Sequence, residues 1–398
     1  MNGSALDERR SKFSTSSLND RLLVYQRVLG FMNSNQTKNQ RIAIVTGGGD
    51  APGLNAVIRA VVKAANRRGW ECIGVLGGFE GLLDPVQTCP LDQRQLGSLL
   101  YRGGTILGTT NRGRFAAKTG TGDLRRVPVE ILKETKRNFD QLRLDALVAI
   151  GGDGSLTIAQ QLYETGIPVV GVPKTIDNDL EATLMTFGFE TAMTVAVEAL
   201  DRLTSTAESH NRVMVLEVMG RYAGWIAGYA GLAGGADVIL IPEIEFNYEA
   251  ICKKIQQRED EGKHFTIVIA AEGAREKGGA YVTTGVQTDD REVHLGGIGH
   301  LVAEEIQMRT AKESRAVVLG HLQRGGPPTA WDRLLCTRYG VFAVEMIAHG
   351  NFGAMVALTS HGIEPVRLTD ATARIRLVPV DGELVRVARA LGVSFGDA

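Results

Sequence analysis

The stretch of the sequence with the most potential chemistry is PKTIDNDL, residues 173–180, which directly follows an apolar run. It holds a cation, a hydroxyl and two carboxylates, on Lys174, Thr175, Asp177 and Asp179. In an extended segment the two carboxylates project to the same side. One of them can then accept a proton from a substrate hydroxyl while the other helps to hold a metal ion, and a nearby cation limits their repulsion.

Two glycine-rich runs each stand between an apolar stretch and a helical pattern. TGGGD, residues 46–50, contains Gly48, and GGDGS, residues 151–155, contains Asp153. Glycines let the backbone approach a phosphate, amides at a helix start bind it, and a carboxylate can hold magnesium. Each run alone is also compatible with a tight turn, although we favour the functional interpretation, and runs similar to GGDGS occur in NAD kinases and in diacylglycerol-type lipid kinases.

Cationic side chains stand beside several further apolar runs. They are Arg212, Arg221, Arg315, His321 and Arg324, of which Arg221 lies in MGRYAGW and the last two lie in GHLQRGG. Taken singly, such a residue is as often a structural ion-pair partner. Together they supply the local positive charge that is needed to bind sugar phosphates and to stabilise a transferring phosphoryl group.

The elements that must position these residues alternate between short apolar strands and helical stretches, beginning at Arg41. Strands are predicted in RIAIVT, LDALVAI, IPVVGVP, RVMVLEVM, ADVILIP, FTIVIAA and RAVVLGH. Helices are predicted from about Pro52, in SLTIAQQLYE and in FETAMTVAVEALDRL. This alternation predicts an α/β fold of βαβ units, built as two Rossmann-like lobes with parallel-rich sheets and an active site in the cleft between them.

The expected domain boundaries follow from the same patterns. A larger donor-binding domain is expected at 41–188 with about 320–360, and a smaller sugar-phosphate domain at about 189–319. Residues 1–40, which include the amphipathic patch 18–32, are expected to form an appended arm, and residues 361–398 a C-terminal extension that packs on the lobes.

Composition limits the classes of partner. Of 398 residues, 44% are hydrophobic, and 44 Lys and Arg balance 45 Asp and Glu, so no overall charge attracts nucleic acid or a membrane. No apolar run approaches the roughly 20 residues of a membrane helix. Four scattered cysteines form neither a disulfide framework nor a zinc motif, which favours a cytoplasmic location.

Taken in order, the motifs resemble the signature series of the 6-phosphofructokinase family over residues 41–360. They are TGGGDAPGLNAVIR, RGGTILGT, AIGGDGS, PKTIDND, EVMGRYAGW, AAEG and LGHLQRGG. PKTIDND and MGR in register after GGDGS are not found in NAD or lipid kinases. The resemblance implies transfer of a phosphoryl group to the 1-hydroxyl of fructose 6-phosphate, with Mg²⁺, in a cleft between two α/β domains.

The resemblance also implies roles for individual residues. Asp177 is expected to be the base, Asp153 to hold the magnesium ion with Asp179 assisting, and Thr175, Arg221 and Lys174 to act on the transferring group. The residues expected to bind the donor phosphates are Gly48, Arg112, Gly152, Asp153, Gly154 and Ser155. Arg114 is the alternative to Arg112, because LGTTNRGRF is out of step with the shorter family version.

The sugar phosphate is expected to contact residues from both halves of the chain. In the same subunit these are Thr175, Asp177, Asp179, Met219, Gly220, Arg221, Glu272, His321 and Arg324. Arg212 and Arg315 match family arginines that reach the 6-phosphate of a neighbouring subunit. The resemblance therefore implies a homodimer or homotetramer with shared sites.

Two positions give conflicting indications of the phosphoryl donor. Gly154 resembles ATP users, in which a small residue leaves room for the nucleotide, whereas Lys174 resembles pyrophosphate users. We give Gly154 more weight, since an added lysine can coexist with a nucleotide, and predict ATP. A pyrophosphate-dependent phosphotransferase and a non-catalytic metabolite-binding subunit are the alternatives; Asp153, Asp177 and Arg221 argue against the latter.

Overall fold

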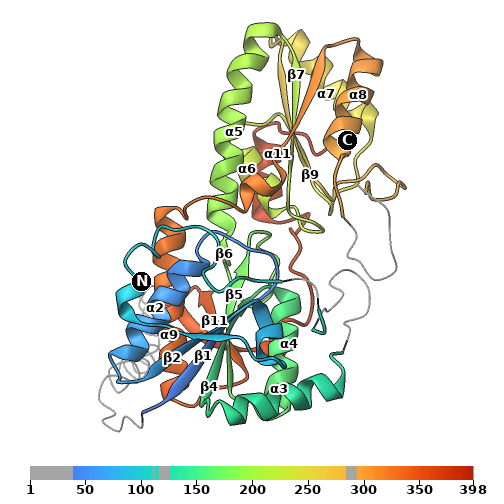
Figure 1. Cartoon of the computed structure of the whole chain (residues 1–398). Coiled ribbons are helices and arrows are strands. Elements are labelled where there is room, and N and C mark those ends of the chain that lie inside the picture. Colours follow the sequence, from blue (N-terminus) through green and yellow to red (C-terminus); the bar gives the residue numbers. More distant parts are fainter. Residues whose placement is uncertain (1–38, 111–112, 116–125, 284–293, 398) are drawn as a thin grey trace, which may run out of the picture. The chain divides into compact units, whose positions relative to one another are not determined.

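The computed structural model describes residues 39–110, 113–115, 126–283 and 294–397, and all elements below belong to the unit Gln40–Ala398. Apart from its last two residues, the predicted arm at 1–40 lies outside the described residues and stays a prediction. Two sheets with flanking helices make up the unit (Figure 1). Among the described residues, no helix is long and apolar enough to cross a membrane.

The larger sheet has the strand order β12-β11-β5-β4-β1-β2-β3, with β6 paired to β5. Its strands are β1 (Arg41–Thr46), β2 (Glu71–Val75), β3 (Thr88–Pro90), β4 (Ala146–Gly151), β5 (Val169–Thr175), β6 (Phe187–Gly188), β11 (Ala354–Thr359) and β12 (Gly362–Arg367). The five central strands are parallel and only the two edge strands run antiparallel. The central strands are buried on both faces, which explains their continuous apolar runs.

Alternate residues of each central strand face different helices. On β1, Ile42 and Ile44 pack with α2 (Leu54–Asn66) and α9 (Ala330–Ala348). Ala43 and Val45 face the side of α3 (Val129–Gln141), α4 (Asp153–Glu164) and α10 (Leu368–Ala371). The two helical layers therefore fix the sheet from both sides and leave its strand ends to form loops.

The smaller sheet is wholly parallel, in the order β10-β7-β9-β8. Its strands are β7 (Val213–Val218), β8 (Val238–Leu240), β9 (Thr266–Ala271) and β10 (Ser314–Val318). α5 (Phe189–His210), α6 (Trp225–Ala233) and α11 (Glu383–Ala390) pack with one face, and α7 (Tyr248–Asp260) and α8 (Ile298–Thr310) with the other. The two parallel-rich sheets confirm the predicted α/β fold.

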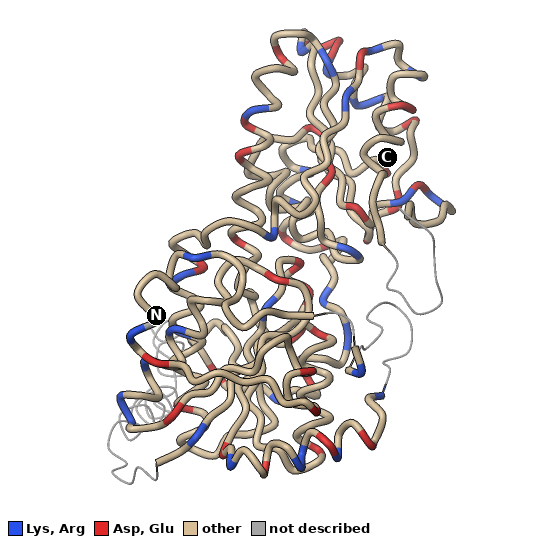
Figure 2. Tube along the Cα trace, in the orientation of Figure 1, with Lys and Arg blue, Asp and Glu red and all other residues tan. Residues whose placement is uncertain are grey.

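The C-terminal residues contribute to both sheets. β11 and β12 complete the larger sheet, whereas Val385, Ala388 and Phe395 are buried with α5 and α6, and Ser394 bridges to Val238 in the smaller one. The described residues also contain short 3₁₀ helices: η1 (Gly78–Leu82), η2 (Gln93–Gln95) and η3 (Gly320–Gln323). Basic and acidic residues are interspersed along the helices (Figure 2).

Candidate functional site

The two glycine-rich runs and the PKTIDND stretch meet at the carboxyl edge of the larger sheet. They follow β1, β4 and β5, which are neighbouring parallel strands. A Cβ on Gly48 would lie 3.3 Å from Ser155 Oγ and 3.4 Å from Lys174 Nζ. Thr109, from RGGTILGT, donates a hydrogen bond to the carbonyl of Gly48 at 2.6 Å. Gly48 thus lies next to residues of three other motifs.

The two glycine-rich runs differ in how they meet a helix. GGDGS leads directly into α4, which begins at Asp153 and includes Gly154 and Ser155. TGGGD does not lead directly into a helix, because Gly53 has the left-handed φ of 111° and α2 begins only at Leu54. The helix-start amides that suit a phosphate at this edge are therefore those of α4.

The prediction that Asp177 and Asp179 lie on an extended segment is wrong. β5 ends at Thr175, and Asn178 adopts a left-handed φ of 53°, a conformation that asparagine tolerates because its side chain bonds locally. Asn178 Oδ1 accepts the Thr186 amide at 3.0 Å, and Thr175 Oγ1 accepts the Asp177 amide at 3.1 Å. The chain therefore turns at Asp177 instead of continuing as a strand.

Asp177 is more deeply buried than the neighbouring carboxylates Asp153 and Asp179. It is 5% exposed, and its Oδ1 has no hydrogen-bond partner among the described residues. A buried carboxylate oxygen without a donor is costly, so such an atom marks a place where a ligand hydroxyl or a cation completes the site.

Charged groups from four motifs act on one another here. Burial, followed by the charges of Asp177 and Asp153, raises the pKa of Asp179 to about 8. Burial and then the charge of Asp177 raise the pKa of Glu272 to about 7. Burial and then the charge of Arg324 lower the pKa of Lys174 to about 8. Such mutual perturbation is typical of functional sites.

The smaller sheet brings its predicted residues to the ends of β7, β9 and β10. The amide of Arg221, whose φ is 50°, donates to Glu272 Oε1 at 3.1 Å. A Cβ on Gly273 would lie 1.8 Å from the Arg221 carbonyl, so only glycine fits there. Arg324 Nη1 donates to the carbonyl of Asp50 at 3.1 Å and so reaches the TGGGD run of the larger sheet.

Two neighbouring predicted residues, Met219 and Gly220, follow β7 directly. The Met219 amide donates to Gln323 Oε1 at 2.8 Å, while Gln323 Nε2 donates to the carbonyl of Ala192 on α5. Gln323 is fully buried and fixes this turn. Gln323 was not predicted as a site residue, although an uncharged polar residue between His321 and Arg324 in GHLQRGG was the available signal.

Arg212 and Arg315 are not brought to this site within the chain. They lie at the amino-terminal ends of β7 and β10, whereas Met219 follows the carboxyl end of β7. A six-residue strand separates these two ends of the sheet by about 20 Å. Both guanidinium groups pair with Glu313, at 2.7 and 2.6 Å. His321 lies exposed on η3, and Arg112 lies outside the described residues.

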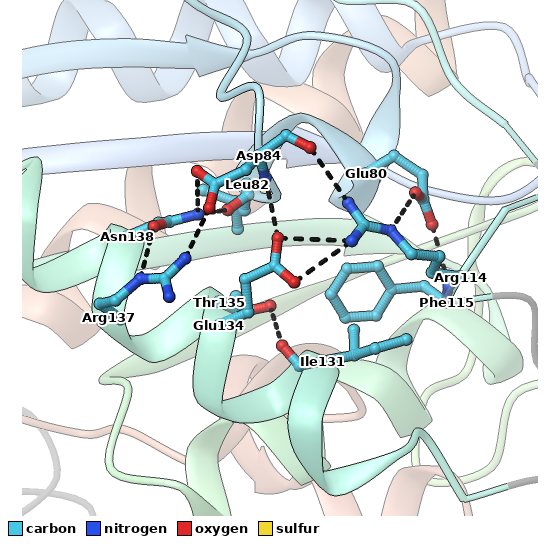
Figure 3. Close-up of polar contacts among 10 residues, drawn as sticks. All are labelled: Glu80, Leu82, Asp84, Arg114, Phe115, Ile131, Glu134, Thr135, Arg137 and Asn138. Atoms are coloured by element: carbon cyan, nitrogen blue, oxygen red, sulfur yellow. Dashed lines mark hydrogen bonds and ion pairs between the residues drawn. The ribbon is translucent and has the colours of Figure 1, made fainter.

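Arg114 is held in a polar network with carboxylates of η1 and α3 (Figure 3). Its Nη1 donates to Glu134 Oε2 at 3.2 Å, and its Nε lies 3.7 Å from Glu80 Oε2. Glu80 also accepts the Phe115 amide at 2.9 Å, and Phe115 packs against Phe79 with ring centroids 5.7 Å apart. The Arg114 guanidinium is thus engaged by two carboxylates, and the prediction of Arg112 or Arg114 as the donor arginine stays a prediction.

The residues present suit a magnesium ion that is shared with a bound phosphate. Among the described residues, no three His, Cys, Asp or Glu side chains are grouped so as to hold a metal. Mg²⁺ is usually held by one or two carboxylates together with substrate phosphates and water. The carboxylate of Asp153, at the start of α4, together with that of Asp179, which interacts with its charge, matches that kind of donor set.

The fold and the arrangement of motifs define an α/β protein with glycine-rich loops at the strand ends of its larger sheet, and the comparisons identify its family. The phosphofructokinase family model matches residues 41–347, so the chain belongs to the phosphofructokinase family. It is 52% identical over 363 residues to the ATP-dependent 6-phosphofructokinase of Chloroflexus aurantiacus, covering 91% of this chain and 99% of that protein.

Two further matches are a relative named for another phosphoryl donor and a longer protein of known structure. The chain is 51% identical over 341 residues to the pyrophosphate–fructose 6-phosphate 1-phosphotransferase of Amycolatopsis methanolica, covering 85% of this chain and 96% of that protein. The structure of phosphofructokinase from Saccharomyces cerevisiae superimposes with a TM-score of 0.71 at 29% identity, over 84% of this chain and 45% of that one. The chain thus spans about half the length of the yeast protein.

Proposed function

We propose that this protein transfers the γ-phosphoryl group of ATP to the 1-hydroxyl of fructose 6-phosphate, giving fructose 1,6-bisphosphate and ADP in glycolysis. The 1-hydroxyl oxygen forms a bond to the γ-phosphorus while the bond from phosphorus to the β-phosphate oxygen breaks. The hydroxyl proton passes to the Asp177 carboxylate. The relatives at about half identity support this reaction.

The observation that carries the proposal is the unpartnered, buried Oδ1 of Asp177. A general base must lie within hydrogen-bond reach of the proton it accepts and must have a free lone pair there. Asp177 lies two residues beyond the end of β5, close to where Ser155, Gly48 and Lys174 meet. This position supports a role for the carboxylate in accepting the proton of a sugar hydroxyl.

The surrounding residues supply the charge and alignment that in-line transfer requires. The amides at the start of α4, with Gly152, Gly154 and Ser155, bind the donor phosphates, and Arg112 serves as the donor arginine. Thr175 and Arg221 stabilise the transferring group. Met219, Gly220, Glu272, His321 and Arg324 orient the sugar phosphate. In this assignment the larger sheet supplies the donor site and the smaller sheet most of the sugar site.

Magnesium is the cofactor that we assign to Asp153, with Asp179 assisting. When bound, the ion neutralises charge on the donor phosphates and on the leaving group. The raised pKa of Asp179 supports this assignment, because its cause includes the negative charges of Asp177 and Asp153, which a divalent cation would offset. Removal of the metal by a chelator is expected to abolish turnover.

The choice of donor rests on Gly154, because relatives with either donor in their names are almost equally similar. Gly154 lies in the first turn of α4, where an aspartate would repel the α-phosphate of a nucleotide. Pyrophosphate is the second candidate, and the observation that favours it is the buried ammonium of Lys174 beside Gly48. The ammonium of a lysine can replace contacts to phosphate that are lost when pyrophosphate is the donor.

Initial rates of the purified protein with fructose 6-phosphate and magnesium test the proposal, with ATP or pyrophosphate as the only donor. ATP-selective turnover supports it, and Gly154→Asp should then lose activity with ATP more than with pyrophosphate. Pyrophosphate-selective turnover by the wild type would refute the donor, and Lys174→Gly should then lose that activity. No turnover with either donor would favour a non-catalytic subunit.

We also propose that the protein is a homodimer or homotetramer that works in the cytoplasm. The position of Arg212 and Arg315, at the far edge of the smaller sheet, supports a site completed by another copy. All four cysteines are free thiols, which suits a reducing compartment.

A further inference from the structure

A short C-terminal segment, residues 375–378, is hydrogen-bonded on two sides to elements that carry the proposed catalytic residues. On one side Ile375 forms an antiparallel bridge with Leu180, and the amide of Arg376 donates to the carbonyl of Asp179 at 2.8 Å. On the other side the indole of Trp225 donates to the carbonyl of Arg376 at 2.9 Å. The segment therefore joins the Asp177 loop to the start of α6.

The side chain of Arg376 makes the same connection a second time. Its Nη1 donates to the carbonyls of Thr183 and Leu184, at 2.7 and 3.1 Å, and its Cζ lies 4.3 Å from the centre of the Trp225 ring. A planar guanidinium can stack on an indole and donate in its own plane at once. Lysine has no planar group and cannot do both.

A partly buried carboxylate extends the connection to the turn that holds Arg221. Glu243 accepts the amides of Gly224, at 3.0 and 3.1 Å, and of Val378, at 2.8 Å. Gly224 and Trp225 end the MGRYAGW motif, so that motif is tied to residues 375–378 at two adjacent positions. Arg376 thus stands between the loop with Asp177 and the turn with Arg221.

We propose that Arg376 is a positioning residue for phosphoryl transfer, fixing the loop of Asp177 relative to the turn of Arg221. The proposal rests on the proposed function, in which these two residues act on the same phosphoryl group. Transfer depends on alignment within fractions of an ångström, whereas binding of either substrate uses many other contacts. Loss of Arg376 should therefore lower kcat more than it raises KM.

Three variants test this role. In Arg376→Ala, kcat is expected to fall about 10- to 100-fold, with KM for donor and sugar changing less than about threefold. Arg376→Lys keeps the charge but loses the stacking, so its kcat should lie between those of the wild type and Arg376→Ala. Arg374→Ala is the matched control: Arg374 lies in the same region, its side chain is 79% exposed, and it pairs with Glu181 at 2.8 Å. Its kcat should stay at the wild-type value.

Two further measurements separate positioning from general stability. Millimolar guanidinium ion should partly restore kcat in Arg376→Ala, because it can occupy the space over Trp225, and should not affect Arg374→Ala. Hydrogen exchange should become faster in peptides that cover 176–186 and 219–226 in Arg376→Ala, but not in the control.

The possible outcomes are distinct. An unchanged kcat in Arg376→Ala, an equal loss in Arg374→Ala, or unchanged exchange in both peptides overturns the proposal. A loss of kcat that guanidinium does not restore, with exchange raised throughout the chain, assigns Arg376 to general stability and also overturns it. If the wild type is inactive with both donors, the proposed function fails; faster exchange confined to the two segments would then still support the fixing of loop and turn by Arg376.

Discussion

Lys174 places a positive charge at the end of β5, where the donor phosphates are expected, but burial lowers the pKa of its ammonium group. The side chain is 3% exposed, and Nζ donates to the carbonyl of Gly49 at 2.5 Å. Burial and the charge of Arg324 together lower the pKa to about 8. Attraction between the ammonium and a donor phosphate therefore depends on pH near the upper end of the physiological range.

This pKa leads to a prediction about donor binding. Since Lys174 loses its proton as the pH rises through about 8, kcat/KM for the donor is expected to fall above that pH. The Lys174→Met variant should show a smaller fall, and the difference between the two profiles separates the lysine from Asp179 and Glu272. Parallel profiles for the two proteins would mean that Lys174 does not contact the donor.

Asp177 provides the sharpest test of the chemistry. Asp177→Asn keeps the shape of the side chain but removes the basic oxygen, so kcat is expected to fall by about 10²- to 10⁴-fold. Binding of fructose 6-phosphate, measured by calorimetry, should remain detectable. Asp201→Asn, on the exposed surface of α5, is the control for loss of a carboxylate. Turnover that survives in Asp177→Asn would refute the base assignment.

At the residue scale the sequence predicted which positions gather but not how they are held. Lys174, Ser155 and Gly48 meet as expected, because strand ends of a parallel sheet share an edge. The contact of Arg324 with Asp50 spans 274 positions, and no local pattern indicates such a partner. The left-handed turn at Asn178 was missed because the alternation of Asp177 and Asp179 also suits a strand.

Among the elements, α5 depends on a cap that comes from another helix. Gly188 at its start has no side chain, and the Asp332 carboxylate on α9 accepts the amides of Gly188 and Thr191 at 3.0 and 2.9 Å. It also accepts the Thr191 hydroxyl at 2.5 Å. Because α5 covers the smaller sheet, this single carboxylate joins α9 of the larger sheet to the first turn of α5.

Replacing this cap is expected to destabilise the fold. Asp332→Asn turns one accepting oxygen into an amide that faces a donor, so the free energy of unfolding should fall by about 1–3 kcal/mol. Thermal unfolding would show a lower Tm than for Asp201→Asn, which lies on the exposed face of α5. An equal Tm for the two variants would show that the cap contributes nothing to stability.

Element prediction succeeded for the buried parallel strands and failed for the less typical ones. β1, β4, β5 and β7 were confirmed, since β-branched runs buried on both faces leave a clear pattern. β11 was missed because its sequence, AMVALT, contains alanine and methionine, which favour helices. β12 was missed because it contains Pro365 and is largely exposed at a sheet edge.

For the whole molecule, the positions of Arg212 and Arg315 predict cooperation between copies. Both lie at the edge of the smaller sheet that faces away from Met219, so a site that uses them must take them from a second chain. In the single chain they are paired with Glu313 and their charge is partly offset. Each site would then contain Asp177 of one subunit and Arg315 of the other.

Mixing two inactive variants tests this arrangement. Asp177→Asn and Arg315→Ala each lack one component, but when they are coexpressed the intact Asp177 of one and the intact Arg315 of the other should form a complete site. Activity of the coexpressed pair should exceed that of either variant alone, assayed at equal total protein. If the pair shows only the average of the two, each subunit works with its own residues.

The path of the C-terminal residues has a consequence for biosynthesis. β11 and β12 complete the larger sheet, and α11 with Phe395 completes the core of the smaller one. Domains usually fold in turn as a chain leaves the ribosome, from the N-terminus onward. Here the larger sheet lacks β11 and β12, and the core of the smaller sheet lacks α11 and Phe395, after all their other strands have been translated. During that interval the unfinished apolar faces of both sheets are open to chaperones.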